Sequence, residues 1–225
     1  VYDDSEFLLE SCLLFDKDNI EVALDYIDVL IKRQKYGKAL KEAHKLYKRD
    51  KKNLRFMIAY AATLQQTNKQ DEALKLYDEI LDVDKKNPEV LVAKGHLQKT
   101  FGDVKGSIKS YKSSYISDRF YGDAYWSLAN LKTYRFSDDE ISELESMTND
   151  EYINDNEKIY MNFALGKAYE DINEYAKSFE NYKKGNSLKK ETSKFDLKQF
   201  SEECKNQMEV CSQDLFESKN DWGIT

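Results

Sequence analysis

Histidine and cysteine, the residue types that most often carry chemistry, are few and widely separated in this chain. The two histidines, His44 and His96, form no HExxH pattern and no cysteine–histidine ligand spacing. The three cysteines are odd in number and lack a CxxC pair, which favours a reduced, cytoplasmic setting. The eight glycines are scattered singly, so no phosphate-binding loop is visible. These patterns predict no catalysis, cofactor or metal within this chain.

A second group of residues is suited to recognition. Trp126, Asn130, Lys132, Tyr134 and Arg135 fall within a short segment, and Trp, Tyr and Arg are the types that most often anchor protein interfaces. We interpret this segment as a partner-binding cluster. The alternative is that Trp126 only packs against the helices that follow it.

The overall charge narrows the class of partner. The net charge is −7, and the basic residues are interleaved with acidic ones instead of forming a block. This distribution argues against a nucleic-acid footprint and against binding to an anionic membrane surface. No apolar run reaches the roughly 20 residues that span a bilayer. A protein or peptide partner is the remaining expectation.

The elements that must position these residues repeat along the chain. Polar residues recur in steps of 34, which is the length of a tetratricopeptide helix–turn–helix unit. Apolar residues between them show helical and not strand periodicity. The recurring residues are Asp16, Asp50, Asp84 and Asp118, together with Asn19, Asn53 and Asn87.

The chain thus resembles the tetratricopeptide repeat family. The resemblance implies an all-α fold, a right-handed α–α superhelix of about five helix–turn–helix repeats, with residues 1–225 forming one solenoid domain. We expect twelve helices, including half a repeat at 1–19 and a capping helix at about 196–217 that covers the end of the stack. The expected repeats span about 20–53, 54–87, 88–121, 122–155 and 159–192.

Small residues predict where the two helices of a repeat approach closely. They face one another as Ala61 with Ala73, Gly95 with Ser107, and Gly166 with Ser178. A bulky residue at Gly95 or Gly166 should therefore overpack the unit. Turn and cap residues are also recognisable: Asn68, Gly102 and Asn173 suit a left-handed turn, and Ser137 with Glu140 forms a capping box.

The first helices should line a concave groove, where we expect a protein or peptide ligand. Residues at their fifth and ninth positions include Ile58, Val92 and His96, followed by Trp126 and Asn130. The clamp by which some tetratricopeptide proteins bind chaperone carboxyl termini requires several Lys and Asn residues here. Only Asn130 matches that pattern, so this partner class is not expected.

Residues 124–147 resemble a more specific family. The string Leu-Lys-Thr-Tyr-Arg-Phe at 131–136, with the segments at 163–171 and 182–188, is similar to the repeat region that precedes the catalytic domain of bacterial tetratricopeptide-containing sulfotransferases. The resemblance implies a catalytic domain after residue 225 that uses the sulfuryl donor PAPS and docks on this chain. No residue here matches the donor loop of that family, so this chain would be non-catalytic.

A second class of function is the alternative. The chain would then be a stand-alone adaptor that assembles other proteins, without an attached enzyme.

Overall fold

A computed structural model describes residues 2–193 and 196–219, and within these ranges every regular element is a helix. Thirteen helices are present in the described part, one more than predicted. They are α1 (Tyr2–Phe15), α2 (Ile20–Lys32), α3 (Tyr36–Arg49), α4 (Leu54–Gln66), α5 (Gln70–Val83), α6 (Pro88–Thr100), α7 (Val104–Ser117), α8 (Gly122–Ala129), α9 (Asp138–Thr148), α10 (Asp155–Asp171), α11 (Tyr175–Thr192), α12 (Leu197–Val210) and α13 (Gln213–Glu217).

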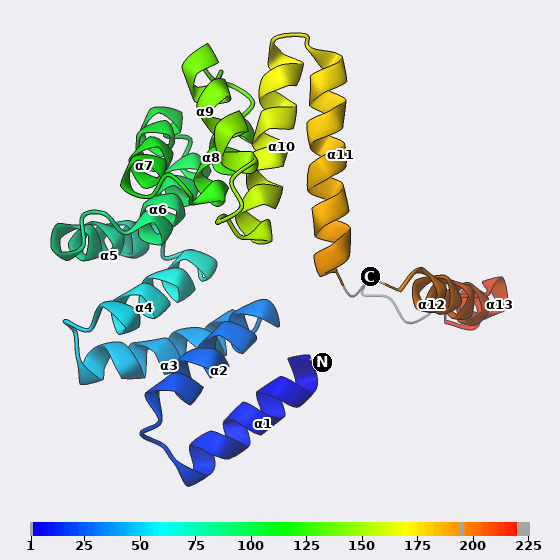
Figure 1. Ribbon diagram of the computed structural model, residues 1–225. Coiled ribbons are helices and arrows are strands. Elements are labelled where there is room, and N and C mark those ends of the chain that lie inside the picture. Colours follow the sequence, from blue (N-terminus) through cyan, green and yellow to red (C-terminus); the bar gives the residue numbers. More distant parts are fainter. Residues whose placement is uncertain (1, 194–195, 220–225) are drawn as a thin grey trace.

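The helices α1 to α11 follow one another along an arc (Figure 1). From α1 to α8 each helix packs on the next, as α9 does on α10 and α10 on α11. The first helices of successive units, α2, α4, α6, α8 and α10, also contact one another. No comparable contact joins successive second helices such as α3, α5 and α7 in the described residues. The first helices therefore lie on the tighter, concave side, and the predicted solenoid of all-α repeats is confirmed.

Polar linkers set where the units begin. The helices α2, α4, α6 and α8 start at Ile20, Leu54, Pro88 and Gly122, in steps of 34 residues. The side chains of the recurring asparagines cap the first three of these helices by accepting bonds from backbone N–H groups, for example Val90 N to Asn87 Oδ1 at 3.0 Å. Such a cap contributes about 1 kcal/mol, which explains why asparagine recurs at this place.

The turn between the two helices of a unit needs a left-handed residue. Asn68, Gly102 and Asn173 have φ angles of 59°, 80° and 64°, so the sequence interpretation of these positions is correct. Gln34 occupies the same position in the first unit, with φ of 58°. This position could not be recognised from the sequence, because glutamine is not a typical residue for this conformation.

Within each unit, one position on each helix decides how close the helices come. A methyl group added to Gly166 would lie 2.7 Å from the ring of Tyr182, and one added to Gly95 would overlap the ring of Tyr111. Ser178 Oγ donates to the carbonyl oxygen of Gly166 at 2.7 Å. A glycine on the first helix thus makes room for a tyrosine on the second.

In the first unit, the large side chain is on the first helix and the small one is on the second. Ile27 is the eighth residue of α2, where α6 has Gly95, and Ala43 is the eighth residue of α3, where α7 has Tyr111. Ile27 is 2% exposed and Ala43 is completely buried. The volume shared by the helix pair is filled in both units, although from opposite sides.

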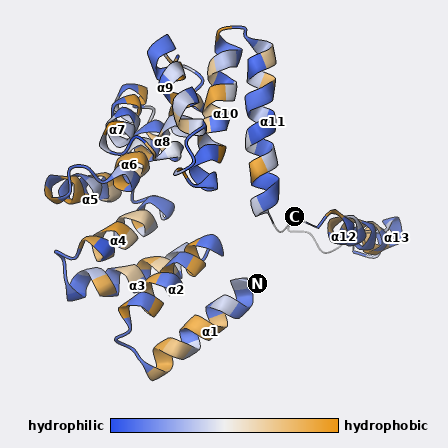
Figure 2. Ribbon diagram, viewed as in Figure 1, coloured by the Kyte–Doolittle hydropathy of each residue, from blue (hydrophilic) through white to orange (hydrophobic). Residues whose placement is uncertain are grey.

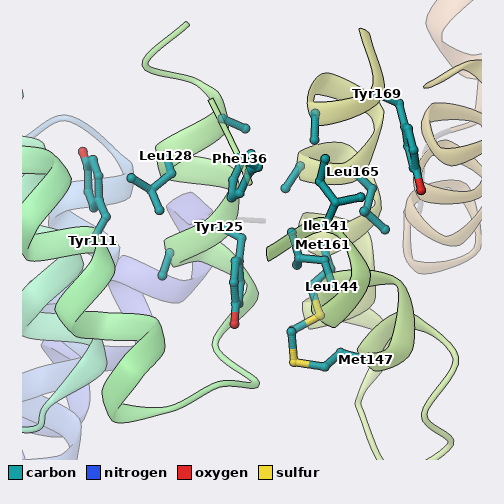
Figure 3. Close-up of a cluster of buried hydrophobic side chains, with 14 of the residues drawn as sticks. Tyr111, Tyr125, Leu128, Phe136, Ile141, Leu144, Met147, Met161, Leu165 and Tyr169 are labelled. Atoms are coloured by element: carbon teal, nitrogen blue, oxygen red, sulfur yellow. The ribbon is translucent and has the colours of Figure 1, made fainter. Parts of the chain in front are cut away.

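The fourth unit departs from the pattern. Its first helix, α8, ends at Ala129, and the capping box of Ser137 and Glu140 begins α9 as predicted. The helix α9 packs on α10, and together they contribute to the largest buried cluster, which Figure 3 shows. The fifth unit starts at Asp155 and not at 159, because α10 has an additional amino-terminal turn capped by Asn154.

The predicted capping helix is present but does not cap the stack. It is broken at Cys211 and Ser212 into α12 and α13, and neither helix has a buried residue. Both lie beyond the carboxyl end of α11, away from the arc (Figures 1 and 2). The expectation failed because an amphipathic pattern predicts a helix but not the surface that it covers.

The glycine at position 95 provides a test of the packing. Gly95→Ala should destabilise the chain by about 1–3 kcal/mol, because Tyr111 is fully buried and cannot move aside freely. The free energy of unfolding from denaturant titration measures this. Gly37→Ala is the matched control, since no atom lies within 4 Å of the added methyl group, and its stability should stay equal or rise by up to about 1 kcal/mol.

A double-mutant cycle completes the test. In a Tyr111→Ala background, Gly95→Ala should lower the free energy of unfolding much less than in the wild type, because the ring that the added methyl group would meet is gone. Additive effects of the two substitutions would contradict the proposed close contact.

Candidate functional site

Three of the predicted partner-binding residues lie around one pocket on the fourth and fifth units. Trp126, Asn130 and Lys132 line a depression of about 370 Å³ together with residues of α10 and α11. We call it the Trp126 pocket. Its remaining lining residues are Ala129, Lys167, Glu170 and Tyr182.

Trp126 forms the aromatic wall of the pocket. Its side chain is half-buried, and its ring lies 5.7 Å from the ring of Phe163 on α10 at an interplanar angle of 51°. Phe163 in turn lies 6.5 Å from the ring of Tyr182 on α11. Trp126 therefore packs against the fifth unit, as the alternative interpretation held, and also leaves part of its surface facing the pocket.

The other side of the pocket is polar. Asn130 is the C-cap of α8 and is exposed, as is Lys132, whose φ of 62° places it in the left-handed region. Lys167 forms ion pairs with Asp171 and with Glu170, the latter at 3.2 Å, and its hydrogen bond to Asp171 raises the pKa of Lys167. The Lys167 charge is thus balanced within the protein, while Asn130 and Lys132 face solvent.

Arg135, which we expected at the interface, has a structural partner. Its Nη1 lies 2.7 Å from Oδ2 of Asp171 on α10, and it also donates to the carbonyl oxygen of Lys132 at 3.2 Å. The Asp171 side chain is only 6% exposed. Arg135 therefore fixes the loop after α8 to the fifth unit, and it does not line the pocket.

Tyr134 is also held elsewhere. Its hydroxyl donates to Oε1 of Glu140 at 2.6 Å, and the Tyr115 hydroxyl donates to the same oxygen at 2.8 Å. Lys112 Nζ lies 3.1 Å from that oxygen and 5.4 Å from the centre of the Tyr134 ring. The placement of Tyr134 in the groove is a correction to the sequence interpretation, because this side chain joins the fourth unit to α7.

These donors determine the charge state of Glu140. Burial alone would raise its pKa, but hydrogen bonds from Tyr134, the Ser137 backbone, Tyr115 and Lys112 outweigh burial and lower the pKa from 4.5 to about 2. The carboxylate is therefore ionised in the folded chain at any pH above this value. It holds three elements together, since α7, the loop and α9 all contribute to its environment.

In the second and third units, the residues predicted to line the groove differ in their exposure. Val92 is 3% exposed and belongs to the buried core, so its assignment as a groove-binding residue is corrected. Ile58 is partly buried against a second core cluster. His96 is exposed, its Nδ1 lies 2.9 Å from the Tyr111 hydroxyl, and burial of part of the ring lowers its pKa. Binding of a partner by Ile58 and His96 stays a prediction.

The sequence interpretation missed four of the pocket residues, Ala129, Lys167, Glu170 and Tyr182. Lys167 stands nine positions into the fifth unit when it is counted from residue 159, as Asn130 does in the fourth. Extending the row of fifth and ninth positions by one unit would have found both Phe163 and Lys167. Glu170 and Tyr182 had no such signal, because their contribution depends on how α10 and α11 meet.

Across 2–193 and 196–219, no group of three or more His, Cys, Asp or Glu residues is placed to hold a metal ion. No helix in these ranges has the length and apolar character that crossing a membrane requires.

Replacing Glu140 tests the network around it. Glu140→Gln should lower the free energy of unfolding at neutral pH by about 1–3 kcal/mol, because it removes the charge of a half-buried carboxylate that accepts several hydrogen bonds. Because the pKa of Glu140 is lower in the folded than in the unfolded chain, its ionised carboxylate stabilises the fold above pH 4.5. This stabilisation is lost as the pH falls towards 2. The difference between variant and wild type should therefore shrink over that range in denaturant titrations.

The control for Glu140 is an exposed acid on the same helix. Glu143, which pairs with Arg119 at 3.6 Å, should tolerate replacement by glutamine with a change within about 0.5 kcal/mol. A loss for Glu140→Gln that stays constant from pH 7 to pH 3 would show that its charge is not what stabilises the loop.

Comparisons with known proteins agree with this architecture. Residues 30–97 match the family model described as tetratricopeptide repeat. The comparison with curated proteins found no match.

Several solved structures share the fold. The structure of BtubC (BKLC) from P. vanneervenii is similar with a TM-score of 0.59 at 12% identity, over 87% of this chain and 91% of that one. A crystal structure of MamA gives 0.52 at 16% identity, over 75% and 97%. The MamA RS-1 ArsTM double mutant gives 0.51 at 14% identity, over 79% and 98%. At such identities the likeness concerns the fold alone, and this chain folds as a tetratricopeptide-type solenoid.

Proposed function

We propose that this chain is a protein-interaction scaffold that holds an extended segment of a partner protein in its concave groove. The Trp126 pocket is the observation that carries the proposal. It combines an aromatic wall with an exposed amide and an exposed cation at its rim, on the side where the first helices converge. Interfaces of this kind depend on a few such anchors.

The arrangement favours a particular mode of binding. An apolar side chain of the partner would fill the space between Trp126, Ala129 and Tyr182. Asn130 can both donate to and accept from a peptide backbone, and Lys132 can pair with an acidic group. Because Arg135 and Lys167 are already paired with Asp171, they support the pocket instead of contacting the partner.

Two uses of such a scaffold remain, as the sequence suggested. The first is a stand-alone adaptor that brings proteins together. The second is the amino-terminal arm of a PAPS-dependent sulfotransferase, which rests on the sequence likeness of residues 124–147 and of the segments at 163–171 and 182–188. In that case PAPS would bind the separate catalytic domain, and the surface around Lys132 would contact that domain. A cytoplasmic location is part of both proposals.

The first experiment tests the pocket. Peptides selected by display on the intact chain should bind Trp126→Ala at least about tenfold more weakly than wild type, because the variant loses an aromatic anchor worth more than about 1 kcal/mol. Titration calorimetry gives both affinities. Ile116→Ala is the control, since Ile116 lies on the second helix α7 and is 74% exposed. Equal affinity for wild type and Trp126→Ala would rule out a pocket centred on Trp126.

The second experiment separates the two uses. The reading frame beyond Thr225 is sequenced, and any encoded domain is expressed apart from the repeats. The sulfotransferase arm requires a domain with a phosphosulfate-binding loop that binds this chain and competes with the selected peptides. A stop codon, or a domain without this loop, would rule out the sulfotransferase arm and favour the stand-alone adaptor.

A further inference from the structure

The fifth unit has a second depression, which shares no lining residue with the Trp126 pocket. It measures about 440 Å³ and lies over α10, between the end of α9 and α11. Figure 1 shows α9 and α11 on either side of α10. We call it the Asn162 groove, and its lining includes Lys158, Asn162, Lys183, Lys184 and Leu188.

The repeat pattern explains why there is space at this place. The fourth residue of the unit is Met57, Leu91 and Tyr125 in the second, third and fourth units, and all three are buried. Asn162 is the fourth residue of the fifth unit when it is counted from residue 159. Its side chain is shorter than the other three, so it fills less of the volume above the first helix.

Asn162 is also a polar residue at a position that is aliphatic or aromatic in the other units. It is 4% exposed, and its Nδ2 donates to the carbonyl oxygen of Lys158 at 2.7 Å. No donor in the described residues reaches its Oδ1, and this atom is not sealed from solvent, so it faces the groove. Packing alone does not account for an amide here, because its acceptor has no partner in the described part of the protein.

A glycine brings α11 close to this amide. Gly185 is buried, and a methyl group added to it would lie 3.0 Å from the ring of Phe163 and 3.4 Å from the Cβ atom of Asn162. The lysines of α11 are therefore held next to Asn162 by helix packing and not by a flexible loop. A groove formed in advance reduces the cost of ordering on binding.

The groove carries unpaired positive charge. Lys158, Lys183 and Lys184 line it, and none of them forms an ion pair within the described residues. Asp155 and Glu180 are also in the lining, so three lysines against two acids leave an excess of one positive charge. This local excess is opposite in sign to the net charge of −7 of the whole chain.

The corresponding depression of the first unit is balanced internally. It is lined by Ala23, the fourth residue of α2, and by Lys45, which is the tenth residue of α3 as Lys184 is of α11. Lys45 forms an ion pair with Glu42 at 2.8 Å. The lysine of the first unit thus has a partner within the chain, whereas Lys184 has none in the described residues.

These groups together define the ligand. The lysines require an anion, and the Asn162 oxygen requires a hydrogen-bond donor. An aspartate or glutamate residue of a peptide supplies both, because it has a carboxylate and a backbone N–H. Leu188, which is half-buried, offers an apolar surface to a neighbouring side chain. Long polyanions such as nucleic acids are disfavoured by the two acids of the groove and by the net negative charge.

We propose that the Asn162 groove binds an acidic segment of a partner protein, with carboxylates beside the three lysines and a backbone N–H donating to Asn162. The groove lies between second helices, so it is a recognition surface on the outer side of the arc. It is independent of the Trp126 pocket, and a scaffold with both surfaces can hold two segments at the same time.

Peptide display tests the class of ligand. Short random peptides are selected on the intact chain, and those that also bind a Lys183→Gln, Lys184→Gln variant are discarded. The recovered peptides should be rich in Asp and Glu, and their binding should weaken as the salt concentration rises. A selection that recovers no peptide, or only peptides without acidic residues, overturns the proposal.

A matched pair of variants tests the position of the peptides. Titration calorimetry should show affinity at least about tenfold weaker for Lys183→Gln, Lys184→Gln than for wild type. Lys189→Gln, Lys190→Gln is the control, because these two exposed lysines of α11 lie outside the groove and the change of charge is the same. It should alter the affinity by less than about twofold. An equal loss in both variants would show attraction to any lysine and overturn the proposal.

Replacement of Asn162 separates recognition from packing. Asn162→Leu places in the fifth unit the residue that Leu91 provides in the third, so its melting temperature should be unchanged or higher. The variant removes the acceptor and fills the groove, and its affinity should fall at least about tenfold. Wild-type affinity, or a lower melting temperature that shows a structural role for the amide, overturns the proposal.

Competition distinguishes the two recognition surfaces. Peptides recovered for the Asn162 groove should not displace peptides that need Trp126. Mutual displacement would place both sets in one site and overturn this inference, without contradicting the proposed function of the Trp126 pocket.

Discussion

The structure depends on how closely the two helices of a unit approach each other. A single unit cannot enclose a core, so each helix must bury its apolar side against a neighbour along the chain. The eighth residue of the first helix sets the distance, and the eighth residue of the second supplies the volume. Gly95 with Tyr111 and Ile27 with Ala43 satisfy the same requirement in opposite ways. Repeats of one fold therefore tolerate different side chains, provided that the sum of the two volumes is kept.

The same packing creates the functional surface. Because successive first helices contact one another while second helices do not, the stack curves, and the first helices form its inner side. The short α8 interrupts this regularity and leaves room for the loop that carries Asn130 and Lys132. Arg135 and Tyr134 then attach the loop to Asp171 and Glu140. The pocket is thus a consequence of an incomplete helix and of the polar contacts that compensate for it.

Features that are local in sequence were predictable, and those that depend on distant partners were not. The turn at Asn68, the capping box at Ser137 and the 34-residue spacing follow from preferences within a few residues. The role of Arg135 depends on Asp171, which is 36 residues away, and no pattern around Arg135 indicates that pairing. Likewise, the sequence of α12 shows an amphipathic helix, but its place depends on a surface that amphipathicity does not specify.

Within the described residues, the buried side chains form three separate clusters along the arc instead of one continuous core. A pulling force applied at the two ends would therefore pass through these clusters in series, with each junction carrying the full tension. Such a molecule stretches by small changes of angle at its junctions before any cluster opens. Elastic compliance of this kind would let the arc widen or tighten around objects of different diameter without loss of its helices.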